Sequence, residues 1–518
     1  MKKLLLGNAA VARGAYEAGV RVVSSYPGTP STEITEQIVP YKEIYAEWAP
    51  NEKVAAEVAI GASIGGARAM SCMKHVGLNV MADPVFTVSY SGVNGGLVFC
   101  VADGPGMHTS QHEQDSRHYA EAAKIPMLEP SDSAECKNFT KLAYTISETF
   151  DAPAFLRLST RVSHSQSLVE LEEPEEVALK PYEKDAAKYV MMPANAIKRH
   201  VVVEERMRKL AEYAETCPIN RVESKGNKIG VISAGIAYLY AKEALGDQVD
   251  YCKLGMIYPM PKQMLLDFAA QHETVYVIEE LDPFIETYCR SLGISVIGKE
   301  AFSLLGEYTP HQIRKVVLGE EEPAYQVPGE PIPVRPPVMC AGCPHRGVFY
   351  VLHKLKLQVS GDIGCYTLGA LPPFRAIDTC LDMGASITMA KGAADAGVFP
   401  AIAVIGDSTF THSGMTGLLD AVNDKAQITV IISDNLTTAM TGGQDSAGTN
   451  KFEAICLGLG VEPEHVRVVV PLPKNMEEIT RILREEIEYK GVSVIIPRRE
   501  CIQTLNRKLK QKRAEKKA

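Results

Sequence analysis

Short apolar runs that end in Gly, Asp, Ser, Glu or Asn, each followed by a helix-like amphipathic pattern, recur along the chain. Examples are LVFCVADG, KIGVISAG, TVYVIEE, AIAVIGDS and ITVIISDN. This alternation is typical of parallel α/β units, whose ligand sites lie beyond the carboxyl ends of the strands. The sequence therefore predicts an α/β fold made of doubly wound parallel sheets.

Two stretches interrupt the alternation and divide the chain. Residues 164–195 are rich in charge and contain prolines, and residues 318–338 read LGEEEPAYQVPGEPIPVRPPV. Proline excludes a helix interior or a central strand, so the second stretch is predicted to be an extended linker. A chain of 518 residues also exceeds the size of one core. We predict three α/β domains, a linker and a short basic tail with a solvated, frayed end, at residues 1–170, 190–317, 318–338 (linker), 338–505 and 506–518 (tail).

Charge and apolar patterning exclude several classes of protein. The net charge of −9 gives no basic field for nucleic acid. No apolar run reaches the ~18 residues of a membrane span, and the N-terminal leucines are too few for a signal peptide. We therefore expect a cytoplasmic protein, with no nucleic-acid or membrane partner. In that setting the 12 cysteines are expected to be free, metal-bound or redox-active rather than paired in disulfides.

An acid and an amide follow two successive strands in the third predicted domain. Gly406-Asp407-Ser408 comes after AIAVI, and Asn435 follows ITVIIS. Both side chains present oxygen ligands at one sheet edge, and Mg²⁺ prefers oxygen ligands completed by phosphate and water. We predict a Mg²⁺-bridged diphosphate site, with Asp407 and Asn435 as side-chain ligands and the backbone carbonyl near Thr437 as a third. A lone GDS turn is common, and its pairing with Asn435 around one strand–helix–strand unit makes the signal more specific.

The GDS…DN pair resembles the thiamine diphosphate motif. The strings at 7–34, 51–84, 340–373 and 405–444 resemble the α subunit of indolepyruvate:ferredoxin oxidoreductases over nearly the whole chain. The resemblance implies oxidative decarboxylation of aryl 2-oxoacids with coenzyme A, giving an acyl-CoA, CO₂ and electrons for ferredoxin. It also implies that the first domain binds the pyrimidine of the cofactor, that the second is transketolase C-terminal-like, and that the third binds the diphosphate.

One departure from the family concerns the electron relay. Its α subunits usually end in a ferredoxin-like module with two iron–sulfur clusters, and this sequence contains no C-x₂-C-x₂-C-x₃-C run. We expect either a separate protein to carry that relay or the final electron acceptor to differ. The missing cluster-binding run does not change the expected decarboxylation of the 2-oxoacid.

Glu52 and Thr29 are the predicted catalytic residues of the first domain. Enzymes of this cofactor use a carboxylate at the start of the helix after the second strand of the pyrimidine domain, and the resemblance places Glu52 there. Glu57 would point to another helix face. A helix-opening Glu is also a routine dipole partner. Thr29, in SSYPGTPS, matches a threonine that contacts the substrate carboxylate in related enzymes, although Thr29 and Ser31 can equally form a helix N-cap cluster.

Two histidines lie in loops beside these motifs: His75 in MKHVG and His345 in GCPHRG. Imidazole titrates near neutral pH, which suits proton transfer or stabilisation of a developing oxyanion. The alternative for each is an ordinary, hydrogen-bonded polar residue. The sequence assigns neither a specific role.

Four cysteines of the third domain form a candidate cluster site. Cys340 and Cys343 form C-x₂-C, Cys365 follows Gly364 in SGDIGC, and Cys501 follows the apolar run VSVIIP. Four thiolates from loops of one domain can hold a [4Fe–4S] cluster, and the resemblance places such a cluster, and the Gly364–Cys365 turn, beside the cofactor. Structural zinc and free thiols are the alternatives, and Cys380 can replace Cys501.

The favoured function is therefore the catalytic subunit of a 2-oxoacid oxidoreductase that depends on thiamine diphosphate, Mg²⁺ and iron–sulfur. Expected partners are a small second (β) subunit, a second copy of this chain, and ferredoxin or another electron carrier. A non-oxidative decarboxylase or carboligase is the first alternative. A non-catalytic subunit that keeps the fold is the second. The preferred 2-oxoacid rests on the resemblance alone.

Overall fold

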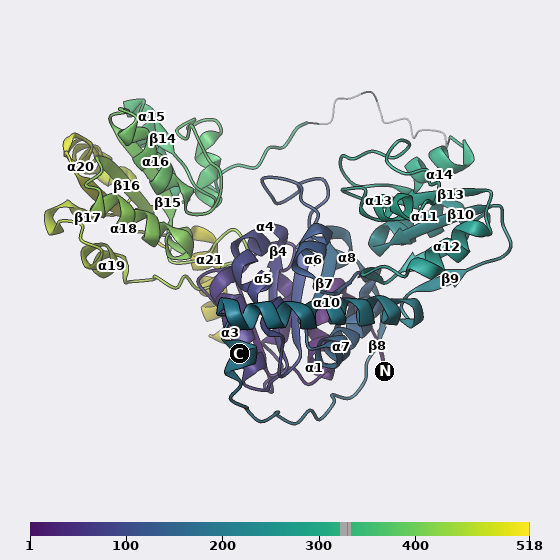
Figure 1. Ribbon diagram of the computed structural model, residues 1–518. Coiled ribbons are helices and arrows are strands. Elements are labelled where there is room, and N and C mark those ends of the chain that lie inside the picture. Colours follow the sequence, from purple (N-terminus) through teal and green to yellow (C-terminus); the bar gives the residue numbers. More distant parts are fainter. Residues whose placement is uncertain (322–328, 330–332, 517–518) are drawn as a thin grey trace. The chain divides into compact units, whose positions relative to one another are not determined.

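The computed structural model describes residues 1–321, 329 and 333–516, and divides into two compact units, Met1–Gln326 and Val327–Ala518 (Figure 1). The predicted linker at 318–338 falls partly outside the described residues, at 322–328 and 330–332. Within the described part of the chain, no helix combines the length and apolarity required to cross a membrane.

A seven-stranded sheet forms the centre of the first unit. All of its neighbouring strands are parallel except the antiparallel pair at one edge. In spatial order the strands are β12 (Met256–Tyr258), β6 (Met127–Leu128), β7 (Ala154–Ser159), β5 (Leu97–Asp103), β4 (Ala69–Lys74), β2 (Val22–Ser25) and β3 (Tyr45–Trp48). The helices around it are α1 (Gly7–Glu17), α2 (Thr32–Ile38), α3 (Glu52–Ile64), α4 (His75–Val80), α5 (Ala82–Ser91), α6 (Arg117–Ala123), α7 (Ser133–Phe150) and α8 (Thr160–His164).

The central strands of this sheet are buried on both faces. Met73 and Phe99 belong to one hydrophobic cluster, whereas Cys72 and Cys100, their neighbours along β4 and β5, belong to another. Successive side chains of a strand point to opposite faces, so helices on both sides cover the sheet. This arrangement explains why the sequence shows nearly continuous apolar runs rather than an alternating pattern.

A second sheet in the same unit has four strands. Its spatial order is β13 (Thr274–Ile278), β10 (Ile229–Ala234), β11 (Asp250–Leu254) and β9 (Arg221–Glu223), with only β9 antiparallel. Its helices are α11 (Gly235–Leu245), α12 (Lys262–Ala270), α13 (Phe284–Ser291) and α14 (Pro310–Leu318). Ile232 and Val277 share a cluster with Phe99 of the larger sheet, and β12 pairs with β6. The first two predicted domains therefore share a core and a sheet edge.

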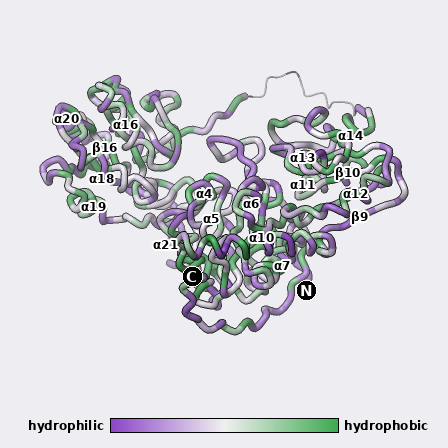
Figure 2. Tube along the Cα trace, viewed as in Figure 1, coloured by the Kyte–Doolittle hydropathy of each residue, from purple (hydrophilic) through white to green (hydrophobic). Residues whose placement is uncertain are grey.

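A polar strap joins these two sheets in sequence. β1 (Lys2–Leu6) pairs antiparallel with β8 (Gln166–Glu170), and residues 171–185 then run without helix or strand. Figure 2 shows this stretch as largely hydrophilic. Backbone hydrogen bonds from Glu175 N to Glu17 O and from Lys180 N to Gly66 O hold it against the first sheet domain. It leads through α9 (Ala186–Tyr189) to α10 (Pro193–Thr216), which packs on α5 and α12.

The second unit contains one fully parallel five-stranded sheet. The strand order is β14 (Val359–Ser360), β15 (Ala401–Gly406), β16 (Ile428–Ser433), β18 (Val492–Pro497) and β17 (Val466–Val469). Its α-helices are α15 (His345–Leu355), α16 (Ala385–Asp395), α17 (Asp407–Thr409), α18 (Met415–Asn423), α19 (Phe452–Gly458), α20 (Met476–Glu488) and α21 (Ile502–Glu515). All residues of β15, β16 and β18 are buried between two hydrophobic clusters. The prediction of an α/β fold with doubly wound parallel sheets is confirmed.

The expectation of a frayed basic tail was wrong over most of its length. Residues 502–515 form α21, and no side chain of this helix is buried. Arg507 Nη1 donates a 2.9 Å hydrogen bond to Gly442 O. The charge run is solvated, but lysine, arginine, glutamine and alanine are good helix formers, and they extend the helix begun by Ile502.

Candidate active site

Two oxygen ligands meet at the carboxyl edge of the five-stranded sheet. Asp407 follows β15 and Asn435 follows the neighbouring β16, in a register that pairs Gly406 with Ser433. The backbone nitrogen of Thr437 lies 3.1 Å from Asp407 Oδ2 and 3.2 Å from Asn435 Oδ1. The two side-chain oxygens therefore converge on one amide group, as expected for residues that end adjacent parallel strands.

Asp407 is a buried carboxyl group in an electrostatically unfavourable place. Burial raises its pKa to about 7, and the negative charge of Asp434 adds to the effect. Its hydrogen bonds come from backbone amides, including Ser408 N at 2.7 Å and Thr437 N. A divalent cation here would offset the cost of the buried charge. The carboxylate of Asp407 and the amide oxygen of Asn435 are oxygen donors of the kind that fits Mg²⁺, and the carbonyl of Thr437 remains the predicted third ligand.

The turn that carries Asp407 is closely packed. A Cβ at Gly406 would lie 2.5 Å from the Tyr366 ring, so the turn requires glycine there. Ser408 Oγ lies 2.5 Å from Thr438 Oγ1, which joins the Asp407 turn to the loop after Asn435. A π-helical turn, Phe410–Gly414, follows α17, and such turns are frequent at functional sites.

A second buried acid next to this turn was missed by sequence reasoning. Asp362 accepts hydrogen bonds from Gly384 N at 2.9 Å and Ser386 N at 3.0 Å, and burial raises its pKa to about 6. It ties the Gly364–Cys365 turn to the start of α16. The signal was present, because Gly361-Asp362 follows β14 just as Gly406-Asp407 follows β15.

In the first unit, Glu52 lies at the carboxyl edge of the seven-stranded sheet. It begins α3, and the preceding Asn51 caps that helix by accepting a 2.9 Å hydrogen bond from Val54 N. Glu52 is 5% exposed, and a Cβ at Gly77 would lie 2.5 Å from its Oε1. Glu57 is exposed and pairs with Lys53, which confirms that it points elsewhere.

Lys74, which ends β4, is a buried charged residue at this edge that the sequence did not reveal. Burial lowers its pKa to about 8, and the nearby Glu52 carboxylate opposes that shift. Its Nζ donates a 2.8 Å hydrogen bond to Thr109 O. Its aliphatic stem lies where a Cβ at Gly28 would come within 3.2 Å. A lysine at the end of an apolar strand carries no motif, so only its surroundings identify it.

Thr29 belongs to the same edge. It precedes Pro30 through a cis peptide bond, and its carbonyl accepts a 3.1 Å hydrogen bond from Thr109 Oγ1. The expected capping by Ser31 was wrong, because Ser31 Oγ donates to Gly28 O at 2.8 Å and makes no cap bond to α2. The hydroxyl serves the tight turn instead of the helix end.

The two predicted histidines lie in different units. His75 begins α4 beside Lys74 and is fully buried, with Nε2 3.1 Å from His112 O, and burial lowers its pKa. His345 begins α15 in the second unit, with Nε2 3.0 Å from Asn435 Nδ2. Burial lowers the pKa of His345 to about 4, which keeps its ring uncharged at neutral pH.

The four cysteines singled out in the sequence are electrostatic neighbours. Burial raises the pKa of the Cys365 thiol to about 11, and the thiols of Cys343, Cys501 and Cys340 raise it further. The neighbours of Cys380 are instead Asp362, Thr367 and Asp382. Cys501, rather than Cys380, therefore completes the group.

The spacing of these thiols bears on what they can bind. Zn–S bonds of about 2.3 Å place the sulfurs of one tetrahedral site roughly 4 Å apart. Among the described residues, one group of three or more His, Cys, Asp or Glu has all its ligand atoms within 4.8 Å of one another, and it consists of Asp115, His118 and Asp282. Asp115 is already paired with Arg117. No three of the four thiols, as the described residues place them, have their sulfurs within 4.8 Å of one another.

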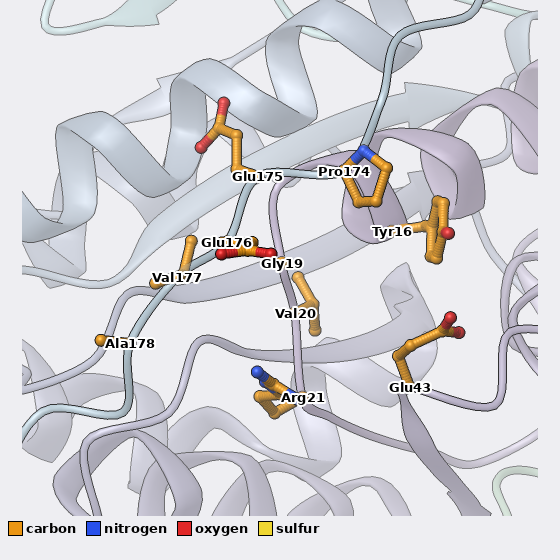
Figure 3. Close-up of a pocket in the computed structure, with 10 residues that line it drawn as sticks. All are labelled: Tyr16, Gly19, Val20, Arg21, Glu43, Pro174, Glu175, Glu176, Val177 and Ala178. Carbon is orange, nitrogen blue, oxygen red and sulfur yellow. The ribbon is translucent and has the colours of Figure 1, made fainter.

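A cavity of about 440 Å³ lies elsewhere in the first unit (Figure 3). Gly19, Val20 and Arg21, just before β2, form one wall, and residues 174–178 of the polar strap form another. Ligand sites of parallel sheets lie at the opposite, carboxyl ends of the strands. None of the predicted site residues lines this cavity.

Family comparisons agree with this geometry. Residues 13–228 match the family described as pyruvate flavodoxin/ferredoxin oxidoreductase, thiamine diphosphate-binding. Residues 362–496 match the C-terminal cofactor-binding domain of thiamine pyrophosphate enzymes. The first match contains Glu52, Thr29 and Lys74, and the second contains Asp407 and Asn435.

Relatives that align with nearly the whole chain identify the family more narrowly. Indolepyruvate oxidoreductase subunit IorA of Archaeoglobus fulgidus is 38% identical, covering 96% of this chain and 86% of that protein. The Thermococcus kodakarensis subunit IorA is also 38% identical, covering 96% and 85%. Among solved structures, 2-oxoglutarate:ferredoxin oxidoreductase from Magnetococcus marinus has a similar fold, with a TM-score of 0.53, 18% identity, and coverage of 61% of this chain and 65% of that one. The resemblance found in the motifs is confirmed: the chain belongs to the IorA family of indolepyruvate oxidoreductase subunits, catalytic subunits of thiamine diphosphate-dependent 2-oxoacid:ferredoxin oxidoreductases.

Proposed function

We propose that this protein oxidatively decarboxylates aryl 2-oxoacids of the indolepyruvate type. The 2-oxoacid anion and the thiol of coenzyme A give an acyl-CoA, CO₂, one proton and two electrons. The observation that carries this proposal is the convergence of Asp407 and Asn435 on the Thr437 amide, in the same unit as a group of four thiols. Support for the aryl side chain comes from the names of the relatives. Support for coenzyme A comes from the Magnetococcus enzyme, whose structure holds coenzyme A and succinyl-CoA.

In this proposal the second unit holds the diphosphate. Asp407, Asn435 and the Thr437 carbonyl would hold Mg²⁺, and the Gly406–Ser408 and Gly364–Cys365 turns would hold the cofactor. When bound, thiamine diphosphate supplies the nucleophilic carbon and the electron sink for loss of CO₂. The charge of Asp407 supports this role, because the buried carboxylate favours a cation beside it.

The first unit supplies the proton-handling and anion-binding groups. Glu52, packed against Gly77, would be the carboxylate that faces the aminopyrimidine ring of bound thiamine diphosphate and holds its proton. Thr29 binds the substrate carboxylate, and Lys74 provides positive charge at the same edge. His75 lies beside Lys74, where its ring can stabilise a developing oxyanion.

We further propose that Cys340, Cys343, Cys365 and Cys501 hold a [4Fe–4S] cluster that takes the electrons first. The relatives are named as subunits, so the oxidoreductase has more than one kind of chain. A small second subunit, a homodimer of this chain, and ferredoxin or another carrier complete the proposed assembly.

The deciding experiment is an anaerobic assay of the purified chain with its second subunit. Indolepyruvate, phenylpyruvate, pyruvate and 2-oxoglutarate are each supplied with coenzyme A and a viologen dye, and acyl-CoA and reduced dye are measured. We expect indolepyruvate or phenylpyruvate to give the highest kcat/KM. Aldehyde formed without coenzyme A would indicate a non-oxidative decarboxylase instead. Failure to bind thiamine diphosphate would indicate a non-catalytic subunit.

A cysteine variant tests the cluster separately. Cys343→Ala should lower the iron content and dye reduction more than it lowers decarboxylation, because the electron acceptor is lost while the carbon chemistry remains. Cys380→Ala is the matched control, since its thiol has no cysteine neighbour among its main interactions. Iron content unchanged in Cys343→Ala would refute the cluster.

A further inference from the structure

One residue lies beside both proposed cofactor sites of the second unit. The ring of His345 lies 3.0 Å from the amide of Asn435, the proposed Mg²⁺ ligand. Cys343, one of the proposed cluster ligands, lies two residues before His345, and the Cys343 carbonyl accepts a 3.3 Å hydrogen bond from the backbone nitrogen of Arg346, the next residue of the helix. The side chain is 3% exposed. His345 is therefore a buried link between the two sites.

The hydrogen bond between His345 and Asn435 has a defined direction. Asn435 Oδ1 already accepts from Thr437 N at 3.2 Å, so the amino group of the amide faces His345 Nε2. A ring that carries its proton on Nδ1 can accept this hydrogen bond at Nε2. With the amide held this way, its oxygen faces the same amide group as Asp407 Oδ2. If the amide turned over, it would present N–H groups to the cation.

The backbone of Asn435 is held by another thiol-bearing loop. Cys501 N donates a 3.0 Å hydrogen bond to Asn435 O. The preceding Asp434 forms a 2.6 Å ion pair with Arg498, in the segment between β18 and Cys501. Asn435 is thus bound to two of the loops that carry the thiols, through His345 on its side chain and through Cys501 on its backbone.

We propose that His345 is a positioning residue that couples the two sites, so that filling the thiol site raises the affinity of the Mg²⁺–diphosphate site. This inference rests on the proposed function. Iron bound by Cys343 and Cys501 would fix both loops, and the fixed loops hold Asn435 with its oxygen toward the cation. By linkage, bound Mg²⁺–thiamine diphosphate must strengthen iron retention by the same factor.

For His345, this positioning role takes the place of the proton transfer considered from the sequence. The Nε2 atom is engaged by Asn435, and the ring is buried in the interior of the second unit. A general acid or base has to reach the reacting atoms, whereas a positioning residue acts through the residue that it holds.

The test measures Mg²⁺-dependent binding of thiamine diphosphate by calorimetry on the full chain. Each protein is purified anaerobically and measured with its iron and after removal of iron by a chelator. For the wild type we expect binding to be about tenfold tighter with iron, within the usual range of coupling between sites. His345→Leu should weaken binding to the iron-loaded protein about tenfold and abolish most of the difference. His345→Gln, whose amide oxygen can accept the same hydrogen bond, should recover part of it.

Each result of this experiment has a different meaning for the proposal. His353→Leu, an exposed histidine of the same helix, should behave as the wild type. Equal affinity with and without iron in the wild type would overturn the coupling, whether or not any variant folds. Unchanged affinity in folded His345→Leu would overturn the positioning role. A wild type that binds neither iron nor thiamine diphosphate would instead contradict the proposed function.

Discussion

The carboxyl edges of the seven-stranded and the five-stranded sheet each carry a buried acid, but the charged groups near that acid differ. In the first unit, the acid Glu52 lies near the ammonium group of Lys74, so the edge contains its own counter-charge. In the second unit, Asp407 lies near another acid, Asp434, and burial raises its pKa to about 7. This difference supports our proposal that a cation completes the second edge, whereas the first edge uses its own groups for protons and substrate charge.

Removing the acid of the second edge should have the most severe consequence, the loss of cofactor binding itself. Asp407→Ala should weaken Mg²⁺-dependent binding of thiamine diphosphate by at least about 100-fold, because it deletes the charged metal ligand. Calorimetric titration with Mg²⁺ and cofactor measures this loss. Asp420→Ala, an exposed aspartate on α18, is the matched control and should bind normally. Retained affinity in Asp407→Ala would place the diphosphate site elsewhere.

Replacing the acid of the first edge should separate binding of the cofactor from its activation. Glu52→Gln should leave the cofactor bound but lower kcat by about 10²–10⁴-fold, the usual contribution of a positioned acid or base. Hydrogen–deuterium exchange at the thiazolium C2 of bound cofactor should slow in parallel. Glu57→Gln changes an exposed glutamate of the same helix and should have little effect. Normal exchange in Glu52→Gln would remove this carboxylate from the mechanism.

The titration of Asp407 sharpens the comparison in the absence of metal. Its pKa rises from an ordinary value of 3.8 to about 7 in the folded protein. The folded state therefore keeps a proton that the unfolded chain releases, so the associated stability is present below pH 4 and is lost as the pH rises to about 7. The loss should be on the order of 2–4 kcal/mol.

Denaturant unfolding of the Mg²⁺-free protein at pH 5, 6 and 7 measures this dependence. Asp407→Asn should have a smaller loss of stability over that range, and the difference isolates this group because Asp362 titrates in both proteins. Saturating Mg²⁺ and thiamine diphosphate should also diminish the loss in the wild type. Identical pH profiles for wild type and variant would show that the Asp407 carboxyl is not strained by burial.

Local sequence patterns predicted the parts of both edges that lie next to strand ends. Asp407 and Asn435 each follow a buried strand, and Glu52 follows the partly exposed edge strand β3. Because β15 and β16 are parallel neighbours, topology alone brings Asp407 and Asn435 together. The sequence also predicted that the thiols lie near one another, because Cys343, Cys365 and Cys501 belong to segments that flank the same sheet. In these places, short-range sequence order determines three-dimensional position.

What the sequence could not predict depends on long-range packing. Lys74 shows no motif, and its altered pKa results from burial among segments distant in the chain. The pairing of β12 with β6 joins two of the predicted domains. The sequence did not reveal it, because a three-residue strand leaves almost no periodic signal. The role inferred for His345 likewise depends on a contact with Asn435, far along the chain.

The smallest predicted effect tests how tightly the first edge is packed. A Cβ at Gly77 would lie 2.5 Å from Glu52 Oε1, so Gly77→Ala must displace that carboxylate or the helix that carries it. Because misplacement by a fraction of an ångström weakens an oriented catalytic group, kcat should fall about tenfold while the cofactor remains bound. Gly61→Ala is the matched control: it lies in α3, the same helix as Glu52, and its new Cβ would meet no atom within 4 Å. Gly61→Ala should keep full activity and gain about 0.5–1 kcal/mol of stability from helix propensity. Equal activity of the two variants would mean that the Glu52 carboxylate has room to move, and that this edge is less preorganised than the contact with Gly77 implies.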